Sequence, residues 1–179
     1  MVVKPVTGGS SVDITIARTL TERDEAINGL MDAYGRVMLE RFVTGRELTV
    51  GIVGEEALPV LEIVPAREFY DYTAKYADEA GTRYVFDHGL SEDLCRKARE
   101  EALIAHRALY CRDMSRVDFI LDDENELQVL EINTIPGFTS HSLLPMAAAK
   151  AGISFEELVD RIARMAMARW PGDRENRTV

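Results

Sequence analysis

The stretch that decides the fold is residues 116–133, which read RVDFILDDENELQVLEIN. Two largely apolar runs, 116–122 and 127–133, flank the polar segment Asp123-Glu124-Asn125-Glu126. This pattern is typical of a β-hairpin. A four-residue loop would make residue 122 face residue 127. The stretch therefore predicts two antiparallel strands whose pairing can be counted from the loop.

Four polar side chains fall on one face of this predicted hairpin. Counting back places Asp118 opposite Glu131 and Arg116 opposite Asn133, and all four share a face because side chains alternate along a strand. Two opposed carboxylates repel each other. A hard divalent cation between them would resolve this, taking oxygens from Asp118, Glu131 and Asn133. The spacing alone leaves open a slipped register, which would put one acid in solvent.

The rest of the chain alternates groups of strands with helices. Because the strands occur mostly as hairpins, an antiparallel α+β fold is favoured over a doubly wound parallel sheet. Residues 65–90 show no period and predict a long loop. We expect strands at 2–4, 12–16, 37–43, 47–53 and 58–64, and helices at 21–34, 91–109, 142–151 and 154–169.

Helical spacing predicts which side chains these helices bury. In the helix that starts at the Ser91 cap, the inward positions are Leu94, Ala98, Ala102, Ala105 and Leu109. His106 is expected on its surface. In the last helix, which opens with Ser154 and Glu157 as a capping box, the inward positions are Leu158, Ile162 and Met165.

Composition excludes several classes of partner. The 179 residues carry 31 acidic and 21 basic side chains, a net charge of −10, which repels nucleic acid and anionic membrane surfaces. No apolar run approaches the roughly 20 residues that span a bilayer. With no signal-peptide pattern at the start, the cytoplasm is the expected location. Cys95 and Cys111 are expected to be reduced structural thiols.

Three further residues are candidates for binding. Lys4 precedes the small-residue loop 7–11, and such a loop can hold a phosphate, although most such loops are only turns. Glu40 and Glu47 lie at strand positions. Either carboxylate can accept hydrogen bonds from a ribose or an amino group, or be an ordinary surface acid.

Taken in order, these motifs resemble the C-terminal part of the D-alanine-D-alanine ligases, which belong to the ATP-grasp superfamily. The match runs from residue 2 to about residue 169. The segments that carry it are 2–5, 9–12, 40–43, 45–50, 69–72, 74–76, 116–118, 130–134 and 136–143.

The resemblance implies an ATP-grasp fold. Residues 1–43 would be a partial, incomplete small ATP-binding lobe, and 44–170 the C-terminal lobe. Residues 65–90 would be a mobile loop over the active site, and 171–179 a frayed tail. The family's N-terminal domain, which supplies the site for the first D-alanine, is not in this sequence. We therefore expect little or no ligase activity from this chain alone.

The resemblance also implies roles for individual residues, with ATP and Mg²⁺ (or Mn²⁺) as cofactors and D-alanine as substrate. Arg116 would stabilise the oxyanion of the tetrahedral intermediate, and Tyr76 would bond to Ser10 and help close the site. Tyr76 also favours an amine over a hydroxyl nucleophile. The remaining roles are ATP binding by Lys4, Glu40, Arg41, Phe42, Val43, Glu47, Tyr70 and Lys75, metal binding by Asp118, Glu131 and Asn133, and a cradle for the second D-alanine formed by Gly137, Ser142 and Leu143.

Some positions depart from the family pattern, and two other functions stay open. The departures are Gly8, Asp13, Asp87-His88 and Ser115. One alternative is a non-catalytic nucleotide-binding or interaction module that dimerises through its N-terminal lobe. The other is a different ATP-grasp carboxylate-amine ligase. Possible protein partners are a second copy of the chain or a complementing N-terminal half.

Overall fold

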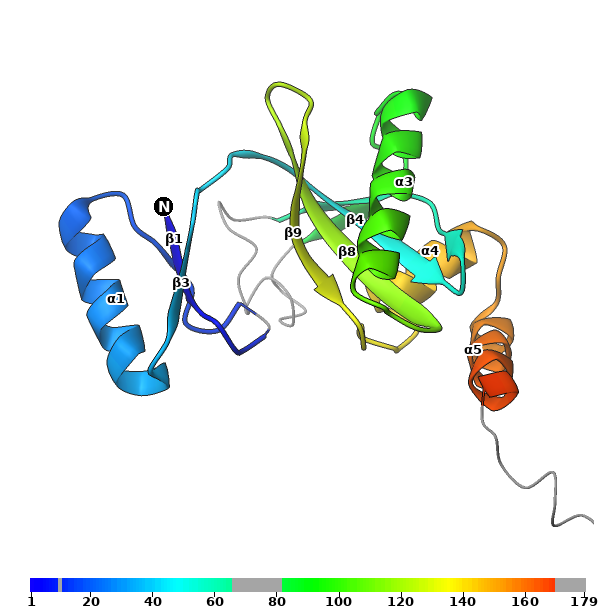
Figure 1. Cartoon of the computed structure of the whole chain (residues 1–179). Coiled ribbons are helices and arrows are strands. Elements are labelled where there is room, and N and C mark those ends of the chain that lie inside the picture. The colour runs from blue at the N-terminus through cyan, green and yellow to red at the C-terminus, as the bar shows by residue number, and fades with distance from the viewer. Residues whose placement is uncertain (10, 66–81, 170–179) are drawn as a thin grey trace, which may run out of the picture. The chain divides into compact units, whose positions relative to one another are not determined.

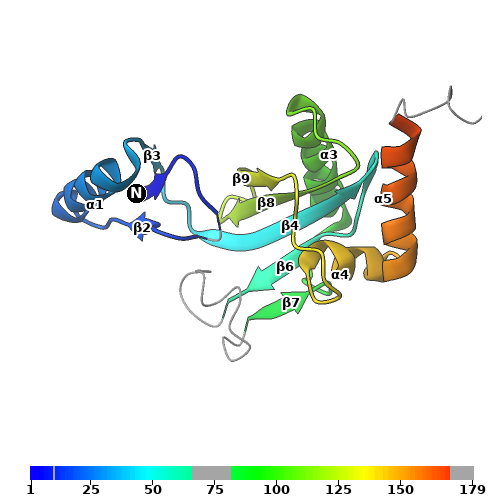
Figure 2. The ribbon, with the colours of Figure 1, turned by 90° about the horizontal axis from the view of Figure 1, so that it is seen from below.

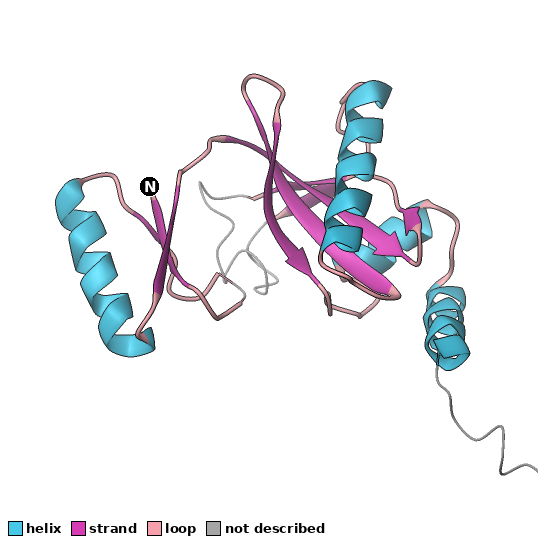
Figure 3. Cartoon of the chain, viewed as in Figure 1, coloured by secondary structure: helices cyan, strands magenta, loops and turns pink. Residues whose placement is uncertain are grey.

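The structure is a computed structural model that describes residues 1–9, 11–65 and 82–169 (Figure 1). The chain divides into two compact units. The smaller unit comprises Met1–Gly45 and Val64–Arg83, and the larger comprises Arg46–Ile63 and Tyr84–Val179. Helices and antiparallel strand pairs make up the described parts (Figure 3), which confirms the predicted α+β class.

In the smaller unit, the described residues form a three-stranded antiparallel sheet with one helix. The strand order is β2-β1-β3. Val3, Ala17 and Leu30 form its buried core, because the strand residue Val3 faces the inner side of the helix. The elements are β1 (Val2–Pro5), β2 (Thr15–Ile16), α1 (Leu20–Tyr34) and β3 (Val37–Glu40).

Three elements of this unit begin or end at residues other than the predicted ones. α1 begins earlier than the predicted Thr21 because Thr19 and Glu22 form a capping box, in which the Thr19 hydroxyl accepts from the Glu22 N–H at 3.1 Å. The predicted strand 12–16 keeps only its last two residues, since Asp13 has a φ of 58°. The predicted strand 37–43 ends at Glu40.

In the larger unit, the residues that the structure describes form a sheet of six strands and three helices. Its main path runs β7-β6-β4-β8-β9, with β5 paired to β4. β7 lies inside the stretch 65–90, where the sequence predicted only a loop, so that prediction was wrong for these residues. The elements are β4 (Gly45–Val53), β5 (Glu56–Ala57), β6 (Leu61–Val64), β7 (Arg83–Val85), α3 (Glu92–Ala108), β8 (Met114–Asp122), β9 (Leu127–Asn133), α4 (Leu143–Lys150) and α5 (Phe155–Arg169).

Two cores cover the two faces of the large sheet, as Figure 2 shows with α3 and α4 on opposite sides. Leu48, Val50 and Ile52 of β4 pack with α3 on one face. Val53 packs with α4 and α5 on the other face. Odd- and even-numbered residues of β4 therefore face different helices, as the alternation of side chains along a strand requires.

Four of the five predicted inward residues of α3 face the core, since Ala98 and Ala102 are buried and Leu94 and Ala105 pack against the same core. The prediction was wrong for Leu109, which is 61% exposed, and for His106, which is only 3% exposed. The buried imidazole of His106 has a hydrogen-bond partner, because its Nδ1 lies 2.7 Å from the hydroxyl of Ser115, itself fully buried in β8. Burial lowers the pKa of His106 below its usual range. Ser115, a departure from the family pattern, thus has a structural partner in His106.

α4 and α5 follow the predictions more closely. Leu158 is buried, and Ile162 and Met165 pack against the same core, so the predicted inner face of the last helix is confirmed. α4 approaches β4 closely at Gly51, where an added Cβ would lie 2.6 Å from Leu144 Cδ1.

Among the described residues, no helix has both the length and the apolar character needed to cross a membrane.

Candidate functional site

The β8–β9 hairpin brings together the four polar residues predicted to share a face. Asp118 pairs with Glu131, and Arg116 pairs with Asn133, so these parts of the predicted register are confirmed. Their neighbours in the strands, Val117 and Ile132, pack on the α3 side. The four polar side chains therefore lie on the sheet face that α4 covers.

The predicted register is wrong at the loop end of the same hairpin. The Asp122 N–H donates to the Glu126 carbonyl at 3.0 Å, which leaves a three-residue loop with Asn125 at a φ of 61°. A β-bulge on β9 then inserts one extra residue, Leu130, between the partners of Phe119 and Asp118. The shorter loop and the bulge cancel, which restores the predicted pairing of Asp118.

Asp118 is the buried centre of this cluster, with 5% of its surface exposed. Arg116 forms a bidentate pair with it, Nε to Oδ1 at 2.8 Å and Nη2 to Oδ2 at 2.7 Å. The Thr49 hydroxyl donates to Oδ1 at 2.6 Å, and Asn133 Nδ2 donates to Oδ2 at 3.0 Å. The buried carboxylate thus accepts hydrogen bonds from four donor atoms.

The amide of Asn133 links the two carboxylates. Its Nδ2 also lies 3.2 Å from Glu131 Oε1, so one nitrogen bridges Asp118 and Glu131. A donor between two carboxylates occupies the kind of position that a shared cation would take. Two carboxylates and an amide oxygen form the hard donor set that Mg²⁺ prefers, so these residues fit the metal.

This donor set is small by the standards of all-protein metal sites. Within the described ranges, no group of three or more His, Cys, Asp or Glu side chains could hold a metal ion. Two carboxylates with an amide instead match the usual way of binding Mg²⁺, in which substrate phosphates and waters supply the remaining oxygens.

Two of the predicted nucleotide-binding residues of the smaller unit, Lys4 and Glu40, form an ion pair. Lys4 Nζ lies 2.8 Å from Glu40 Oε2, across the antiparallel β1–β3 pair in which Val2 faces Glu40. Arg41, Phe42 and Val43 follow β3 outside the strand, and Phe42 is exposed. The side chains of Lys4 and Glu40 are partly exposed, which leaves the pair accessible to a ligand.

Glu47 belongs to the larger unit. It lies in β4 opposite Ile63 of β6, and it is half-buried. Two residues further along β4, Thr49 faces the same side of the sheet and reaches Asp118. Glu47 is thus on the same face as the carboxylate cluster.

The loop before α4 has an unusual cap. Ser142 occupies the N-cap position, yet its side chain makes no capping hydrogen bond to the helix. Its hydroxyl instead accepts from the Thr139 N–H at 3.0 Å and lies 2.9 Å from Thr139 Oγ1. Gly137 allows this, since a Cβ there would lie 3.0 Å from Ser142 Oγ. The first N–H groups of α4, starting with Leu143, are left without a side-chain cap.

Four predicted site residues lie outside the described part of the chain. They are Ser10, Tyr70, Lys75 and Tyr76.

The sequence missed Thr49 as a member of the cluster. Its side chain is 2% exposed, and its hydroxyl contacts the central carboxylate from the neighbouring strand. The signal that could have found it is its position two residues after Glu47, which puts both side chains on one face of β4.

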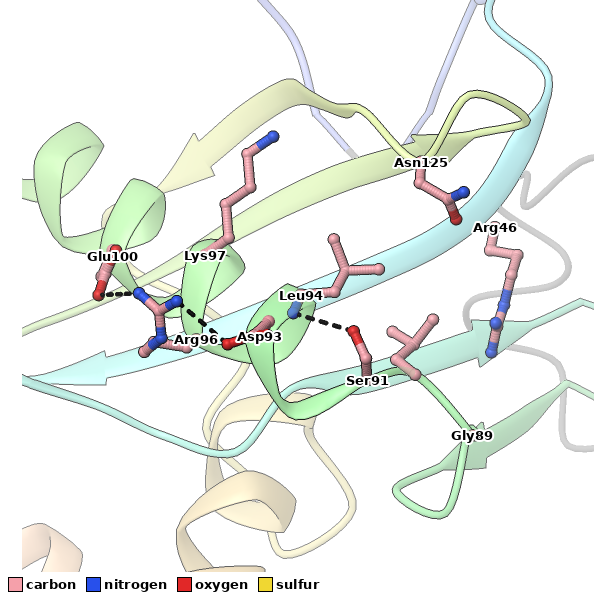
Figure 4. Close-up of a pocket in the computed structure, with 10 residues that line it drawn as sticks. Arg46, Gly89, Ser91, Asp93, Leu94, Arg96, Lys97, Glu100 and Asn125 are labelled. Atoms are coloured by element: carbon pink, nitrogen blue, oxygen red, sulfur yellow. Dashed lines mark hydrogen bonds and ion pairs between the residues drawn. The ribbon is translucent and has the colours of Figure 1, made fainter.

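A hollow of about 870 Å³ lies elsewhere in the larger unit (Figure 4). None of the described site residues lines it, and its cations are paired. Arg96 bonds to Asp93 and Glu100, and Arg46 bonds to Glu62. The hollow is lined by Arg46, Gly89, Leu90, Ser91, Asp93, Leu94, Arg96, Lys97, Glu100 and Asn125. This hollow is therefore not the site predicted from the sequence.

Solved structures with the same fold define the class of protein. A D-alanine-D-alanine ligase from Coxiella burnetii superposes with a TM-score of 0.81 and 30% identity, over 94% of this chain and 45% of that one. A D-alanine-D-alanine ligase from Bacillus anthracis, solved in complex with ATP, gives a TM-score of 0.78 and 32% identity, over 93% of this chain and 53% of that one. The fold is therefore the ATP-grasp fold, as the resemblance implied.

Sequence comparison identifies the family. A family model described as the D-ala D-ala ligase C-terminus matches residues 1–164. The D-alanine–D-alanine ligase of Rhodospirillum rubrum is 46% identical over 92% of this chain and 54% of its own length. That of Trichlorobacter lovleyi is 42% identical over 91% and 52%, respectively. The chain belongs to the D-alanine-D-alanine ligase family, and it spans about half the length of these relatives.

Proposed function

We propose that this chain is the ATP- and Mg²⁺-binding C-terminal portion of a D-alanine-D-alanine ligase. The whole protein would join two D-alanines through an acyl phosphate, in the cytoplasm, for peptidoglycan precursor synthesis. The observation that carries the proposal is the convergence of Asp118, Glu131 and Asn133 at the base of the β8–β9 hairpin.

In this proposal Asp118, Glu131 and Asn133 hold the metal. Mg²⁺ would supply neutralisation and alignment of the ATP phosphates. Asn133 donates through its amide nitrogen to both carboxylates, so its amide turns over to offer the oxygen. Which atom of an amide points inward follows from its hydrogen-bond partners, and a cation bound by the two carboxylates would attract the amide oxygen instead of the nitrogen.

Arg116 has the charge and position to stabilise the oxyanion of the tetrahedral intermediate. Its guanidinium is anchored to Asp118 by two parallel hydrogen bonds, and its side chain is only 15% exposed. A guanidinium that is held before the reaction needs no reorganisation when negative charge develops. Lysine would lack this two-point attachment.

The nucleotide would occupy the part of the chain around Lys4 and Glu40. Lys4 would bind phosphate, Glu40 to Val43 the adenine, and Glu47 the ribose. The Lys4–Glu40 ion pair would be exchanged for contacts to ATP, a change of small cost because partly exposed pairs contribute little. The roles of Ser10, Tyr70, Lys75 and Tyr76 in ATP binding and closure rest on the family resemblance.

The second D-alanine would bind at the start of α4, in the cradle of Gly137, Ser142 and Leu143. Its carboxylate is an anion, and the N-terminus of a helix favours anions. The Ser142 hydroxyl is turned away from the helix towards Thr139. That orientation leaves the first N–H groups of α4 available to a ligand carboxylate.

We also propose that the active protein includes a polypeptide partner, either a second copy of the chain or a complementing N-terminal half. The edge strand β3 supports this, since Leu39 on it is 48% exposed and open strand edges pair readily. The molecular mass of the chain in solution distinguishes a dimer of this chain from a monomer that needs a complementing N-terminal half. A stable dimer that binds neither ATP nor Mg²⁺ would instead favour the interaction module.

The test of the metal site is a calorimetric titration of the chain with Mn²⁺ in the presence of a non-hydrolysable ATP analogue. Asp118→Asn and Glu131→Gln each remove one charged ligand, and we expect each to weaken Mn²⁺ binding by about tenfold or more. Glu124→Gln removes the same charge from the exposed tip of the hairpin. This control should bind Mn²⁺ as the unaltered chain does.

Two results would contradict the proposed site. One is the absence of Mn²⁺ binding by the unaltered chain with the analogue. The other is equal weakening by Glu124→Gln and the two ligand variants, which would assign the effect to the general negative field of a chain with a net charge of −10.

A further inference from the structure

Thr49 connects the central strand of the large sheet to the candidate metal ligand Asp118. It lies in the middle of β4 and is 2% exposed. Its neighbours Leu48 and Val50 point into the core beneath α3, so Thr49 points to the opposite face. There its hydroxyl lies 2.6 Å from Asp118 Oδ1. The buried Thr49 hydroxyl thus lies on the same face of the sheet as Asp118 and contacts its carboxylate.

The single proton of the Thr49 hydroxyl has two acceptors within reach. The Val117 carbonyl is 3.3 Å away, whereas Asp118 Oδ1 is 2.6 Å away. Hydrogen bonds from a hydroxyl to an ionised oxygen are characteristically 2.5–2.7 Å long and stronger than those to a neutral carbonyl. The proton therefore goes to Asp118.

This donor fixes which oxygen of Asp118 points at the other ligands. Oδ1 is held by Thr49 and by Arg116 Nε. Oδ2 accepts from Arg116 Nη2 and from Asn133 Nδ2, the atom that also contacts Glu131. Without the hydroxyl, Arg116 would still bind both oxygens, but nothing from β4 would keep Oδ1 at the strand.

We propose that Thr49 is a positioning residue that orients Asp118 so that Oδ2 is the oxygen presented to the metal. The inference rests on the proposed metal site and adds a residue to it. Carboxylates that ligate metals are themselves hydrogen-bonded, and loss of such a partner typically costs roughly 10–100-fold in metal affinity. Thr49 contributes through Asp118 and does not contact the metal.

The test compares three substitutions at this position by Mn²⁺ titration with the non-hydrolysable ATP analogue. Thr49→Val keeps the branched shape and removes the donor, so we expect Mn²⁺ affinity to fall roughly 10–100-fold. Thr49→Ala also removes the hydroxyl but puts no methyl group in its place. We expect the same loss of Mn²⁺ affinity from it. Thr49→Ser restores the hydroxyl, and its affinity should lie within about threefold of the unaltered chain.

Ser115→Ala is the matched control. Ser115 is a fully buried hydroxyl in β8 whose side-chain partner is His106. Its loss removes a buried hydrogen bond in the same sheet without touching Asp118. We expect a lower melting temperature and unchanged Mn²⁺ affinity for Ser115→Ala.

The outcomes separate the two proposals. If the unaltered chain binds Mn²⁺ and Thr49→Val and Thr49→Ala bind it equally well, the positioning role is overturned while the metal site stands. The role also fails if Thr49→Ser loses as much affinity as Thr49→Val, or if Ser115→Ala loses as much. If the unaltered chain binds no Mn²⁺, both the proposed metal site and the positioning role of Thr49 are overturned.

Discussion

His106 is an ionisable side chain whose charged form is disfavoured by burial in the fold. It is 3% exposed, it lies against Ser115, and desolvation is the largest cause of its lowered pKa. Glu55 and Asp113 raise this pKa and Arg107 lowers it, but burial outweighs them. A group whose pKa is lower in the folded state than in the unfolded state makes stability depend on pH.

The first prediction is a loss of stability on mild acidification. As pH falls through 6.5, the unfolded chain takes up a proton on His106 that the folded chain does not. The free energy of unfolding therefore decreases as pH falls from the ordinary value of 6.5 towards the lower folded pKa. An NMR titration of the imidazole should give a midpoint for His106 below 6.5, and a midpoint at or above 6.5 would contradict this.

At the residue scale, the sequence could predict that the candidate metal ligands share one face of the hairpin, but it could not predict all of the side chains that contact them. Asp118 and Glu131 are close enough in the chain for their pairing to be counted from a turn. Thr49 and Asp118 are 69 residues apart, and no local pattern links them. His106 was expected on the surface of its helix, and the Ser115 hydroxyl that it contacts in the interior belongs to another element.

At the scale of elements, the contact between β4 and α4 depends on the absence of a side chain at Gly51. A Cβ at this position would meet Leu144 Cδ1 at 2.6 Å and Leu58 Cδ1 at 3.1 Å. Leu144 and Leu58 are both almost fully buried. There is little room for either to move, because protein interiors are close-packed.

We therefore predict that Gly51→Ala is destabilising, by about 1–3 kcal/mol. Urea denaturation measures this. The control is Gly29→Ala in α1, where an added Cβ meets nothing within 4 Å. Alanine is the better helix former by about 1 kcal/mol, so the control should raise stability. A stabilising effect of Gly51→Ala would show that α4 can shift away from β4.

Element boundaries were predicted less well than element types. The four predicted helices all exist in the described chain, but α1 starts where its capping box lies and not at the predicted Thr21. β7 was not predicted because a strand of three residues is too short to show an alternating pattern. Strands of this length form through pairing with a neighbour, here β6, and that information is not local.

At the scale of the whole molecule, the chain carries part of the proposed reaction. It matches the C-terminal part of the family and spans about half the length of its relatives. The family resemblance assigns the first D-alanine to the other part. We predict that this chain alone binds ATP with Mg²⁺ but releases no phosphate in response to D-alanine.

A phosphate-release assay with and without D-alanine checks this prediction. The Mn²⁺ titration serves as its positive control, since it shows that the same preparation is folded and binds nucleotide. D-alanine-dependent release at a rate comparable to that of a full-length ligase would contradict it. Such activity would mean that the two units described here hold both D-alanines.

The bulge at Leu130 constrains how the length of this protein can change. Insertions and deletions in a hairpin tip are usually harmless, yet here the pairing of Asp118 with Glu131 depends on one extra residue in β9. Pairing that continued from the three-residue loop without the bulge would set Leu130 opposite Asp118 and would turn Glu131 towards α3, beside the buried Val117. Deletion of Leu130 would remove the bulge and leave Glu131 opposite Asp118, so this change in length keeps both carboxylates on one face.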